Sequence, residues 1–245
     1  MFLDWWTPIE NLPALLKGAL VSLELTLTVF ALSLFFGTIV GFLRYNKHHK
    51  AGYRIATVYV ELIRNTPMLV QIFFLYFGLP QFKIYLPALF AGILGLTINN
   101  TAYIAEIVRS GIQSIPKGQW EAANCLGLKP IHTFLDVIFP QALRNIFPSL
   151  INQFIMILFG TSLLSVLDIK DLTQVASILN SQNFRTLELF TFAIGIYYIM
   201  SVICSKILRY VNNRFFPSIS NGGRENKWMV FYEFSPIGGC CWMVF

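Results

Sequence analysis

Long apolar runs separated by short polar segments make up most of this chain. Five windows of about 20 mostly apolar residues are long enough to cross a lipid bilayer as helices. These windows are Leu20–Leu43, Ile55–Leu79, Ile84–Ile104, Ile146–Val166 and Leu187–Leu208. Too few residues lie between them to build a separate aqueous core. The pattern therefore predicts one all-α membrane domain with about five transmembrane helices in contact with membrane lipid.

Composition agrees with this prediction. Hydrophobic residues make up 56% of the chain and charged residues 12%, against roughly 45–50% and 25% in soluble domains. The four cysteines, Cys125, Cys204, Cys240 and Cys241, lack the paired spacing of a zinc site. All are expected on or near the cytoplasmic side, where thiols stay reduced. We therefore predict reduced thiols and no metal site.

The distribution of basic residues predicts which side of the membrane each loop faces. Thirteen of the 18 Lys and Arg residues lie between the first and second windows, between the third and fourth, or from Lys206, near the end of the fifth window, onward. The positive-inside rule makes that side cytoplasmic, so the N-terminus is expected outside and the C-terminus inside. Because these charges sit at the ends of apolar windows, binding to nucleic acid is not expected.

The two ends of the chain differ from its apolar middle, residues 19–216. Residues 1–18 contain Trp5 and Trp6 and are expected to form an interfacial segment on the outer surface. Residues 217–245 are expected to be an atypical cytoplasmic tail, because no apolar run there is long enough to span a bilayer. A cytoplasmic extension and an altered reading frame both fit this tail.

A partly polar stretch, residues 112–140, lies between the third and fourth windows. Pro116 and Gly118 predict a turn, and the helix-forming residues that follow predict a short helix that stops at Gly127. Lys129 and Pro130 then predict a second short helix that ends at Pro140. Two short helices between membrane spans would form a compact cytoplasmic knob suited to the groove of a partner protein.

The spacing of residues in this stretch resembles the "EAA" coupling loop of ABC importer permeases. The residues that stand where that pattern places them are Glu121, Ala122, Ala123, Gly127 and the closing Ile138-Phe139-Pro140, with Phe139 in place of the usual Leu. The resemblance implies that Glu121, Ala122, Ala123 and Gly127 couple this chain to a separate ATPase. The family's fold is that of a type I ABC importer permease, and residues 19–216 would be its transmembrane domain.

The second window carries charged residues beside a proline. Glu61 and Arg64 are three residues apart, so they share a helix face and could form an ion pair. Charges at membrane depth are costly unless paired or hydrated, which makes both residues candidates for the substrate pathway, with a structural ion pair as the alternative. Pro67 lacks a backbone N–H and is expected to kink or interrupt the helix.

Polar side chains in the third and fourth windows are further pathway candidates. Asn99 and Asn100 place amides in an apolar helix, where other helices or a wet passage must satisfy their hydrogen bonds. In the fourth window the candidates are Asn152, Thr161 and Ser162. Glu106 and Arg109, close to the expected cytoplasmic boundary, are interpreted as packing and capping residues.

Runs in the second and third windows look like the signature of the polar-amino-acid permeases of ABC importers. The matching segments are 59–71, 76–80 and 96–119. Two departures stand out: Asn65 replaces a glycine before the proline, and Phe159-Gly160 replaces the usual Lys-Asp of the fourth window. An intramembrane carboxylate would suit a cationic substrate. Its absence at Gly160 favours a neutral one such as glutamine, unless a second permease supplies the charge.

The resemblance implies a complete transport complex. Two permease domains, identical or homologous, would stand side by side in the bacterial inner membrane on a cytoplasmic ABC ATPase dimer. An extracytoplasmic amino-acid-binding protein would deliver the substrate. The chain has no phosphate-binding Gly-x-x-x-x-Gly-Lys-Ser/Thr stretch and no nucleophile motif, so we predict that it is not an enzyme and holds no cofactor, ATP being bound by the partner. An ion-gradient-driven secondary transporter and a non-transporting membrane scaffold remain the alternatives.

Overall fold

The computed structural model describes residues 5–46 and 50–215. Throughout these residues the chain is built from helices and their connections. The N-terminal half contains α1 (Trp6–Glu10), α2 (Leu12–Tyr45), α3 (Lys50–Arg64), α4 (Met68–Phe73), the π-helix η1 (Phe74–Gly78), the 3-10 helix η2 (Leu79–Phe82) and α5 (Ala88–Gln113). The C-terminal half contains α6 (Lys117–Cys125), α7 (Pro130–His132), the π-helix η3 (Thr133–Ile138), α8 (Phe139–Gly160), the 3-10 helix η4 (Thr161–Leu167), α9 (Leu172–Asn183) and α10 (Thr186–Phe215). The predicted tail, residues 217–245, lies outside the described residues.

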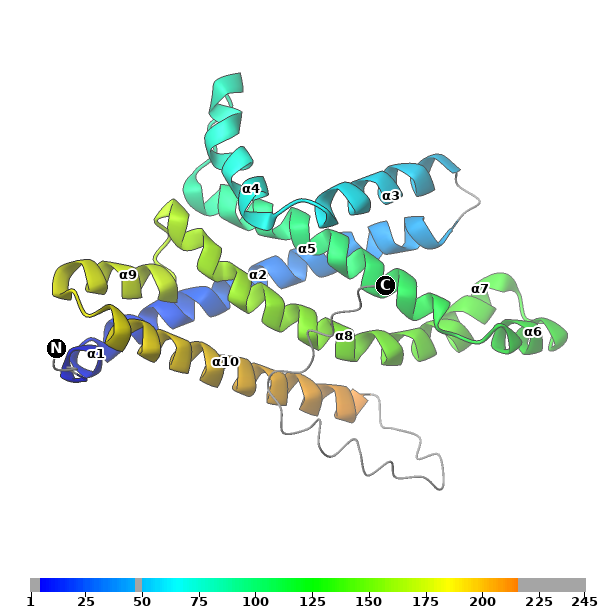
Figure 1. Ribbon diagram of the computed structural model, residues 1–245. Helices are drawn as coiled ribbons and strands as arrows, with labels where there is room; N and C mark the ends of the chain where they lie inside the picture. The colour runs from blue at the N-terminus through cyan, green and yellow to red at the C-terminus, as the bar shows by residue number, and fades with distance from the viewer. Residues whose placement is uncertain (1–4, 47–49, 216–245) are drawn as a thin grey trace, which may run out of the picture.

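Four long helices form an elongated bundle with distinct ends (Figure 1). α2, α5, α8 and α10 run along its length, α1 and α9 lie at one end, and α6 and α7 at the other. Four of the described helical segments are long and apolar enough to cross a membrane, or five if the bent pair α3–α4 counts as one span. The all-α prediction with about five spans is therefore confirmed.

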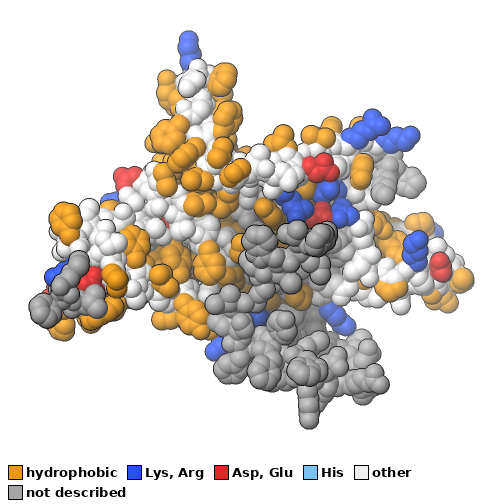
Figure 2. Space-filling view, in the orientation of Figure 1, with side chains coloured by type: hydrophobic (Ala, Val, Ile, Leu, Met, Phe, Trp, Pro, Cys, Tyr) orange, Lys and Arg blue, Asp and Glu red, His pale blue; other side chains and the backbone are white. Residues whose placement is uncertain are grey.

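Apolar side chains are spread over the face of the bundle shown in Figure 2, as a lipid environment requires. Exposed large hydrophobic side chains occur on every long helix and on the bent pair, among them Leu20, Phe35, Ile55, Phe74, Phe90, Met156 and Ile194. A soluble protein rarely exposes such an extended apolar surface. The side chains of these helices are buried only where the helices meet one another.

The boundaries of several windows differ from the predicted ones. The third span begins at Ala88 instead of Ile84, because Pro87 caps the helix, and it continues to Gln113, nine residues beyond the predicted end at Ile104. α2 begins at Leu12 and passes without a break through residues 18 and 19. Hydropathy alone assigns the polar residues at these ends to loops. They are helical because a membrane-spanning helix can continue beyond the apolar core of the membrane.

Close contact between α2 and α5 forms the tightest seam of the bundle. An added Cβ at Gly37 would lie 2.7 Å from Ile104 Cγ2, and one at Gly41 would lie 2.8 Å from Val108 Cβ. Glycines four residues apart allow two helix backbones to approach closely in membranes. Gly37 and Gly41 therefore serve the packing of α2 against α5.

The second window is broken instead of continuous. α3 and α4 are bent by 104° at the three residues between them, which include Pro67. The prediction that Pro67 kinks or interrupts the helix is confirmed. In Figure 1, α4 with η1 and η2 projects away from the bundle as a separate arm.

The knob predicted at residues 112–140 is only partly as expected. α6 forms, and Gly127 follows it with a left-handed backbone (φ 72°) that glycine adopts without a Cβ penalty. The second short helix does not end at Pro140, because α7, η3 and α8 continue one into the next and form a single span, Pro130–Leu167. Proline normally clashes with the turn before it; here that turn is π-helical, which widens the helix ahead of the proline ring.

The opposite end of the bundle is held by a buried aspartate. Asp171 caps α9 by accepting hydrogen bonds from the backbone N–H groups of Gln174 (2.9 Å) and Thr173 (3.2 Å). The Tyr197 hydroxyl of α10 donates to the same carboxylate at 3.2 Å. From this cap α9 runs from Leu172 to Asn183. One side chain therefore ties α9 to α10 at the end where the N-terminus lies.

Candidate functional site

The knob lies beyond the bundle and presents its predicted coupling residues to solvent. Glu121 and Ala122 on α6 are exposed, as is Gly127 after it, whereas Ala123 is buried. No atom lies within 4 Å of the position that a Cβ would take at Gly127. Three of the four predicted coupling residues are thus open to a partner, and Ala123 faces the chain itself.

Apolar and polar contacts fix the knob on the base of α8. Ile115 is buried in a cluster with Ile138 and Ala142, and Trp120 of α6 packs against that cluster. The Asn145 amide of α8 donates a hydrogen bond to the Ser114 hydroxyl at 2.9 Å, just before α6 begins. A force on α6 therefore reaches α8 through packed side chains and through the continuous helix η3–α8.

The break between α3 and α4 is stabilised by one glutamine. The Gln71 side-chain N–H₂ lies 2.9 Å from the Ile63 carbonyl oxygen, 3.2 Å from the Thr66 carbonyl oxygen and 2.6 Å from the Thr66 hydroxyl. These carbonyls lose their helical partners where the helix stops at Arg64. Unsatisfied backbone groups are costly at membrane depth, so Gln71 makes the interruption tolerable.

Amide side chains link the broken span to two neighbouring helices. Asn99 of α5 donates to the Gln71 side-chain oxygen at 3.1 Å, and Gln153 of α8 donates to the Asn100 side-chain oxygen at 2.7 Å. The Asn100 amide N–H₂ in turn donates to the Leu96 carbonyl at 2.7 Å. Asn99 and Asn100 are buried in α5. The structure thus brings these two predicted residues into one polar seam across α4, α5 and α8.

Gln71 and Gln153 are members of this seam that were absent from the predicted site residues. The signal that could have found them is the one that indicated Asn99 and Asn100, namely an amide inside an apolar window. Both glutamines are half-buried. Their partners lie 28 and 53 residues away along the chain, so which amides meet could not be deduced from local spacing.

The remaining polar candidates of the fourth window do not join the seam. Asn152 is exposed on α8. The hydroxyl of Thr161, which is fully buried, donates to the Leu158 carbonyl at 2.7 Å, and that of Ser162 donates to the Phe159 carbonyl at 2.6 Å. Both hydroxyls are therefore engaged with their own helical turn. A role for these three residues in the substrate pathway stays a prediction.

Glu61 and Arg64 lie at a cavity and not in an ion pair with each other. The described ion pairs do not include a Glu61–Arg64 pair, and the Arg64 guanidinium carbon lies 5.2 Å from the centre of the Tyr103 ring. A cavity of about 240 Å³ is lined by Arg44, Val60, Glu61, Arg64, Asn65 and Tyr103. Their residue types can bind both a positive and a negative group.

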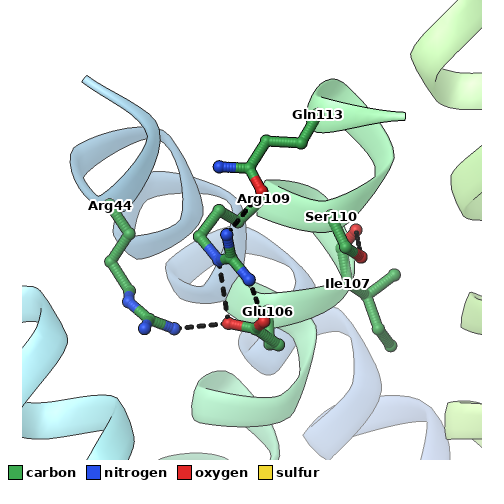
Figure 3. A network of polar contacts seen from close by, with 6 residues as sticks. All are labelled: Arg44, Glu106, Ile107, Arg109, Ser110 and Gln113. Carbon is green, nitrogen blue, oxygen red and sulfur yellow. Dashed lines mark hydrogen bonds and ion pairs between the residues drawn. The ribbon is translucent and has the colours of Figure 1, made fainter. Parts of the chain in front are cut away.

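Glu106 and Arg109 belong to an ion cluster that joins two helices (Figure 3). The Glu106 carboxylate accepts hydrogen bonds from Arg44 of α2 and from Arg109 of its own helix, the Nε of Arg109 lying 3.0 Å from Oε2. Arg109 also donates to the Gln113 side-chain oxygen at 2.6 Å. Two guanidinium groups around one carboxylate fix α2 against α5 near the end where α6 begins.

Known proteins are similar to this chain over most of its length. The family described as "Binding-protein-dependent transport system inner membrane component" matches residues 33–216. The probable glutamine ABC transporter permease protein GlnP of Bacillus subtilis (strain 168) is 44% identical over 174 residues, which cover 71% of this chain and 79% of that protein. The glutamine transport system permease protein GlnP of Escherichia coli (strain K12) is 36% identical over 216 residues, covering 87% and 98%.

Solved structures share the fold. A chain of a crystal structure of an amino acid ABC transporter with histidines is 36% identical and superposes with a TM-score of 0.83, covering 87% of this chain and all of that one. A chain of the MetNI methionine ABC transporter is 19% identical with a TM-score of 0.67 and supports the fold alone. The chain therefore belongs to the binding-protein-dependent transport system inner membrane component family, as a multi-pass inner-membrane permease subunit of an amino-acid ABC importer.

Proposed function

We propose that this chain forms the passage for a neutral polar amino acid, such as glutamine, and that it docks on a separate ATPase through α6. The observation that carries this proposal is the path from the exposed Glu121 of α6, through η3 and α8, to Gln153 in the buried amide seam. A displacement of α6 by the ATPase would move the helix that contacts the middle of α5. The segment from α6 to α8 thus begins outside the bundle and reaches the amide seam.

Docking on the ATPase is supported by the surface of the knob. Leu126 and Ile131, on either side of Gly127, expose 80% and 60% of their surface. Glu121 and Ala122 are exposed one to two turns earlier. Largely exposed apolar side chains beside a carboxylate are typical of a surface that a partner covers.

A neutral substrate is supported by the chemistry of the seam. Its members within the described residues are amides, Gln71, Asn99, Asn100 and Gln153, with no carboxylate among them. Gly160, where relatives usually carry an aspartate, lies close to Met68 at the beginning of α4. Amides hydrogen-bond a neutral polar side chain in both directions, whereas a cationic side chain would need a negative partner. Two relatives, from B. subtilis and E. coli, are named as glutamine permeases.

The remaining parts of the complex follow from the family. We infer a second permease chain, identical or homologous, a cytoplasmic ATPase dimer, and an extracytoplasmic binding protein that meets the end with α1 and α9. The topology is N-terminus outside and C-terminus inside, because most basic residues cluster at the end with α6. Coupling residues are Glu121, Ala122, Ala123 and Gly127, and pathway residues are Glu61, Arg64, Asn99, Asn100, Asn152, Thr161 and Ser162.

Uptake by the reconstituted complex tests the proposal. Proteoliposomes that contain the permease chains and the ATPase, supplied with binding protein outside and ATP inside, should accumulate L-glutamine. Vanadate should abolish this uptake, and a protonophore should leave it unchanged. Uptake that the protonophore abolishes and vanadate does not would indicate an ion-gradient-driven transporter. No uptake under any condition would indicate a scaffold.

A further inference from the structure

The cavity beside the broken span holds charged groups at the expected cytoplasmic boundary of the membrane. Tyr103, which Arg64 covers, lies one residue before Ile104, where the third apolar window ends. Glu61 and Arg64 are exposed in the single chain. Charged side chains at this boundary do not face lipid tails at low cost. Water, a ligand or another protein chain must therefore contact them.

The two charges are arranged so that neither neutralises the other. Arg64 lies against the Tyr103 ring, and no described basic side chain forms an ion pair with the Glu61 carboxylate. Since they are one helical turn apart, both open into the same cavity of about 240 Å³. The third charged group of the cavity lining, Arg44, is already paired with Glu106. Among the described residues, neither the Glu61 carboxylate nor the Arg64 guanidinium has an ion-pair partner within 4 Å, so both remain available to an occupant.

We propose that this cavity binds the zwitterionic head group of an α-amino acid on the cytoplasmic side of the passage. The α-carboxylate contacts the Arg64 guanidinium, whose planar fork can donate two parallel hydrogen bonds. The α-ammonium group contacts the Glu61 carboxylate. The cavity is smaller than the roughly 300–1,000 Å³ of pockets for drug-sized ligands, which suits an occupant of amino-acid size.

This site is separate from the amide seam, although both lie beside the break. Gln71, Asn99 and Gln153 do not line the cavity, and the charged residues do not enter the seam. The residues of the amide seam lie on α4, α5 and α8, whereas α2, α3 and α5 border the cavity. The inference rests on the proposed function, since it adds a head-group site for the transported class of molecule between the seam and the cytoplasm.

The test compares three probes that differ only in the head group. They are L-glutamine, glutaramic acid, which lacks the α-ammonium group, and L-glutaminamide, in which a neutral amide replaces the α-carboxylate. Equilibrium binding of each is measured by calorimetry on the whole transporter in nanodiscs without binding protein. The variants are Glu61→Gln, Arg64→Gln and the conservative Arg64→Lys, with Glu24→Gln, an exposed carboxylate on α2, as the matched control.

The expected pattern pairs each variant with one probe. Loss of a hydrogen bond between charged groups weakens binding by about tenfold or more. Glu61→Gln should therefore weaken the binding of L-glutamine about tenfold. It should leave the binding of glutaramic acid unchanged, because that probe has no ammonium group to contact residue 61. Arg64→Gln should weaken the binding of L-glutamine similarly and leave the binding of L-glutaminamide unchanged. Arg64→Lys should bind L-glutamine more tightly than Arg64→Gln does. Glu24→Gln should change none of the three.

Two other results would overturn the proposal. Equal weakening of all three probes by Glu61→Gln, or no weakening of any, would mean that the carboxylate does not contact an ammonium group. Loss of the second permease chain from the purified variants, measured by native mass spectrometry, would mean that a neighbouring chain fills the cavity. Uptake of L-glutamine by the same transporters, reconstituted in proteoliposomes with binding protein outside and ATP inside, separates the two levels. Absent wild-type uptake refutes the proposed function, whereas normal uptake with either of these results refutes the cavity site alone.

Discussion

Replacing Gly41 with alanine should open the α2–α5 seam. An added Cβ would lie 2.8 Å from Val108 Cβ and 2.9 Å from the Ala105 carbonyl oxygen, which is part of the backbone and cannot rotate away. Ordinary contact requires roughly 0.6 Å more, so the two helices must separate. Arg44 and Glu106, each close to this contact, would be pulled apart by the same movement.

The magnitude follows from two opposing effects. Overpacking a close contact costs about 1–3 kcal/mol, and the gain in helix propensity from Gly to Ala is about 0.5–1 kcal/mol. The free energy of unfolding should therefore fall by about 0–2.5 kcal/mol, with a central value of about 1 kcal/mol. Gly195→Ala on α10 is the matched control, because no atom lies within 4 Å of its Cβ position. It keeps the propensity gain without the clash and should be neutral or slightly stabilising.

Unfolding in detergent micelles with increasing sodium dodecyl sulfate measures both variants against the wild type. The reasoning predicts a lower midpoint for Gly41→Ala only. Equal midpoints for Gly41→Ala and Gly195→Ala would refute it, since the close approach of α2 and α5 would then not constrain position 41.

Three further predictions concern the amide seam and Asp171, which caps α9. Gly160→Asp should let L-arginine compete with L-glutamine for uptake, because it places a carboxylate beside Met68 and Leu96, on two of the helices that carry the amide seam. Gln153→Leu leaves the buried Asn100 side-chain oxygen unpaired and should cost about 1–3 kcal/mol in the same unfolding assay, whereas exposed Asn152→Leu should be near neutral. Burial raises the pKa of the Asp171 carboxyl, so its contribution to stability is present at low pH and is lost as pH rises through that pKa. Asp171→Asn keeps one of the two cap acceptors and does not titrate, so its unfolding midpoint should rise relative to that of the wild type as pH increases from the acid range toward neutrality.

Hydropathy was sufficient to predict the long helices, and glycine spacing was sufficient to predict one close contact between them. The seam through Gly37 and Gly41 was predictable because close packing of membrane helices needs small residues at that spacing. The break at Pro67 was predictable from the missing backbone N–H. Its 104° angle was not, because the angle depends on Gln71, which bonds back to Ile63 and across to Asn99.

Contacts between distant segments account for most of what the sequence did not reveal. The spacing of Glu61 and Arg64 indicated a local ion pair, but Tyr103 of another helix provides an alternative contact for the guanidinium. Glu106 likewise binds Arg44, which lies 62 residues earlier. Pro140 was expected to end a helix, and the π-helical turns before it, which no local propensity predicts, allow that helix to continue.

Co-purification of this chain from native membrane tests docking through α6 most directly. The account predicts that an ATPase subunit with a phosphate-binding Gly-x-x-x-x-Gly-Lys-Ser/Thr motif accompanies the wild-type chain. Glu121→Lys should lose this subunit at normal abundance, while Glu10→Lys, an exposed carboxylate at the opposite end of the bundle, should retain it. An ATPase that stays bound to Glu121→Lys, or a chain that purifies alone and still moves an amino acid without ATP, would contradict the account.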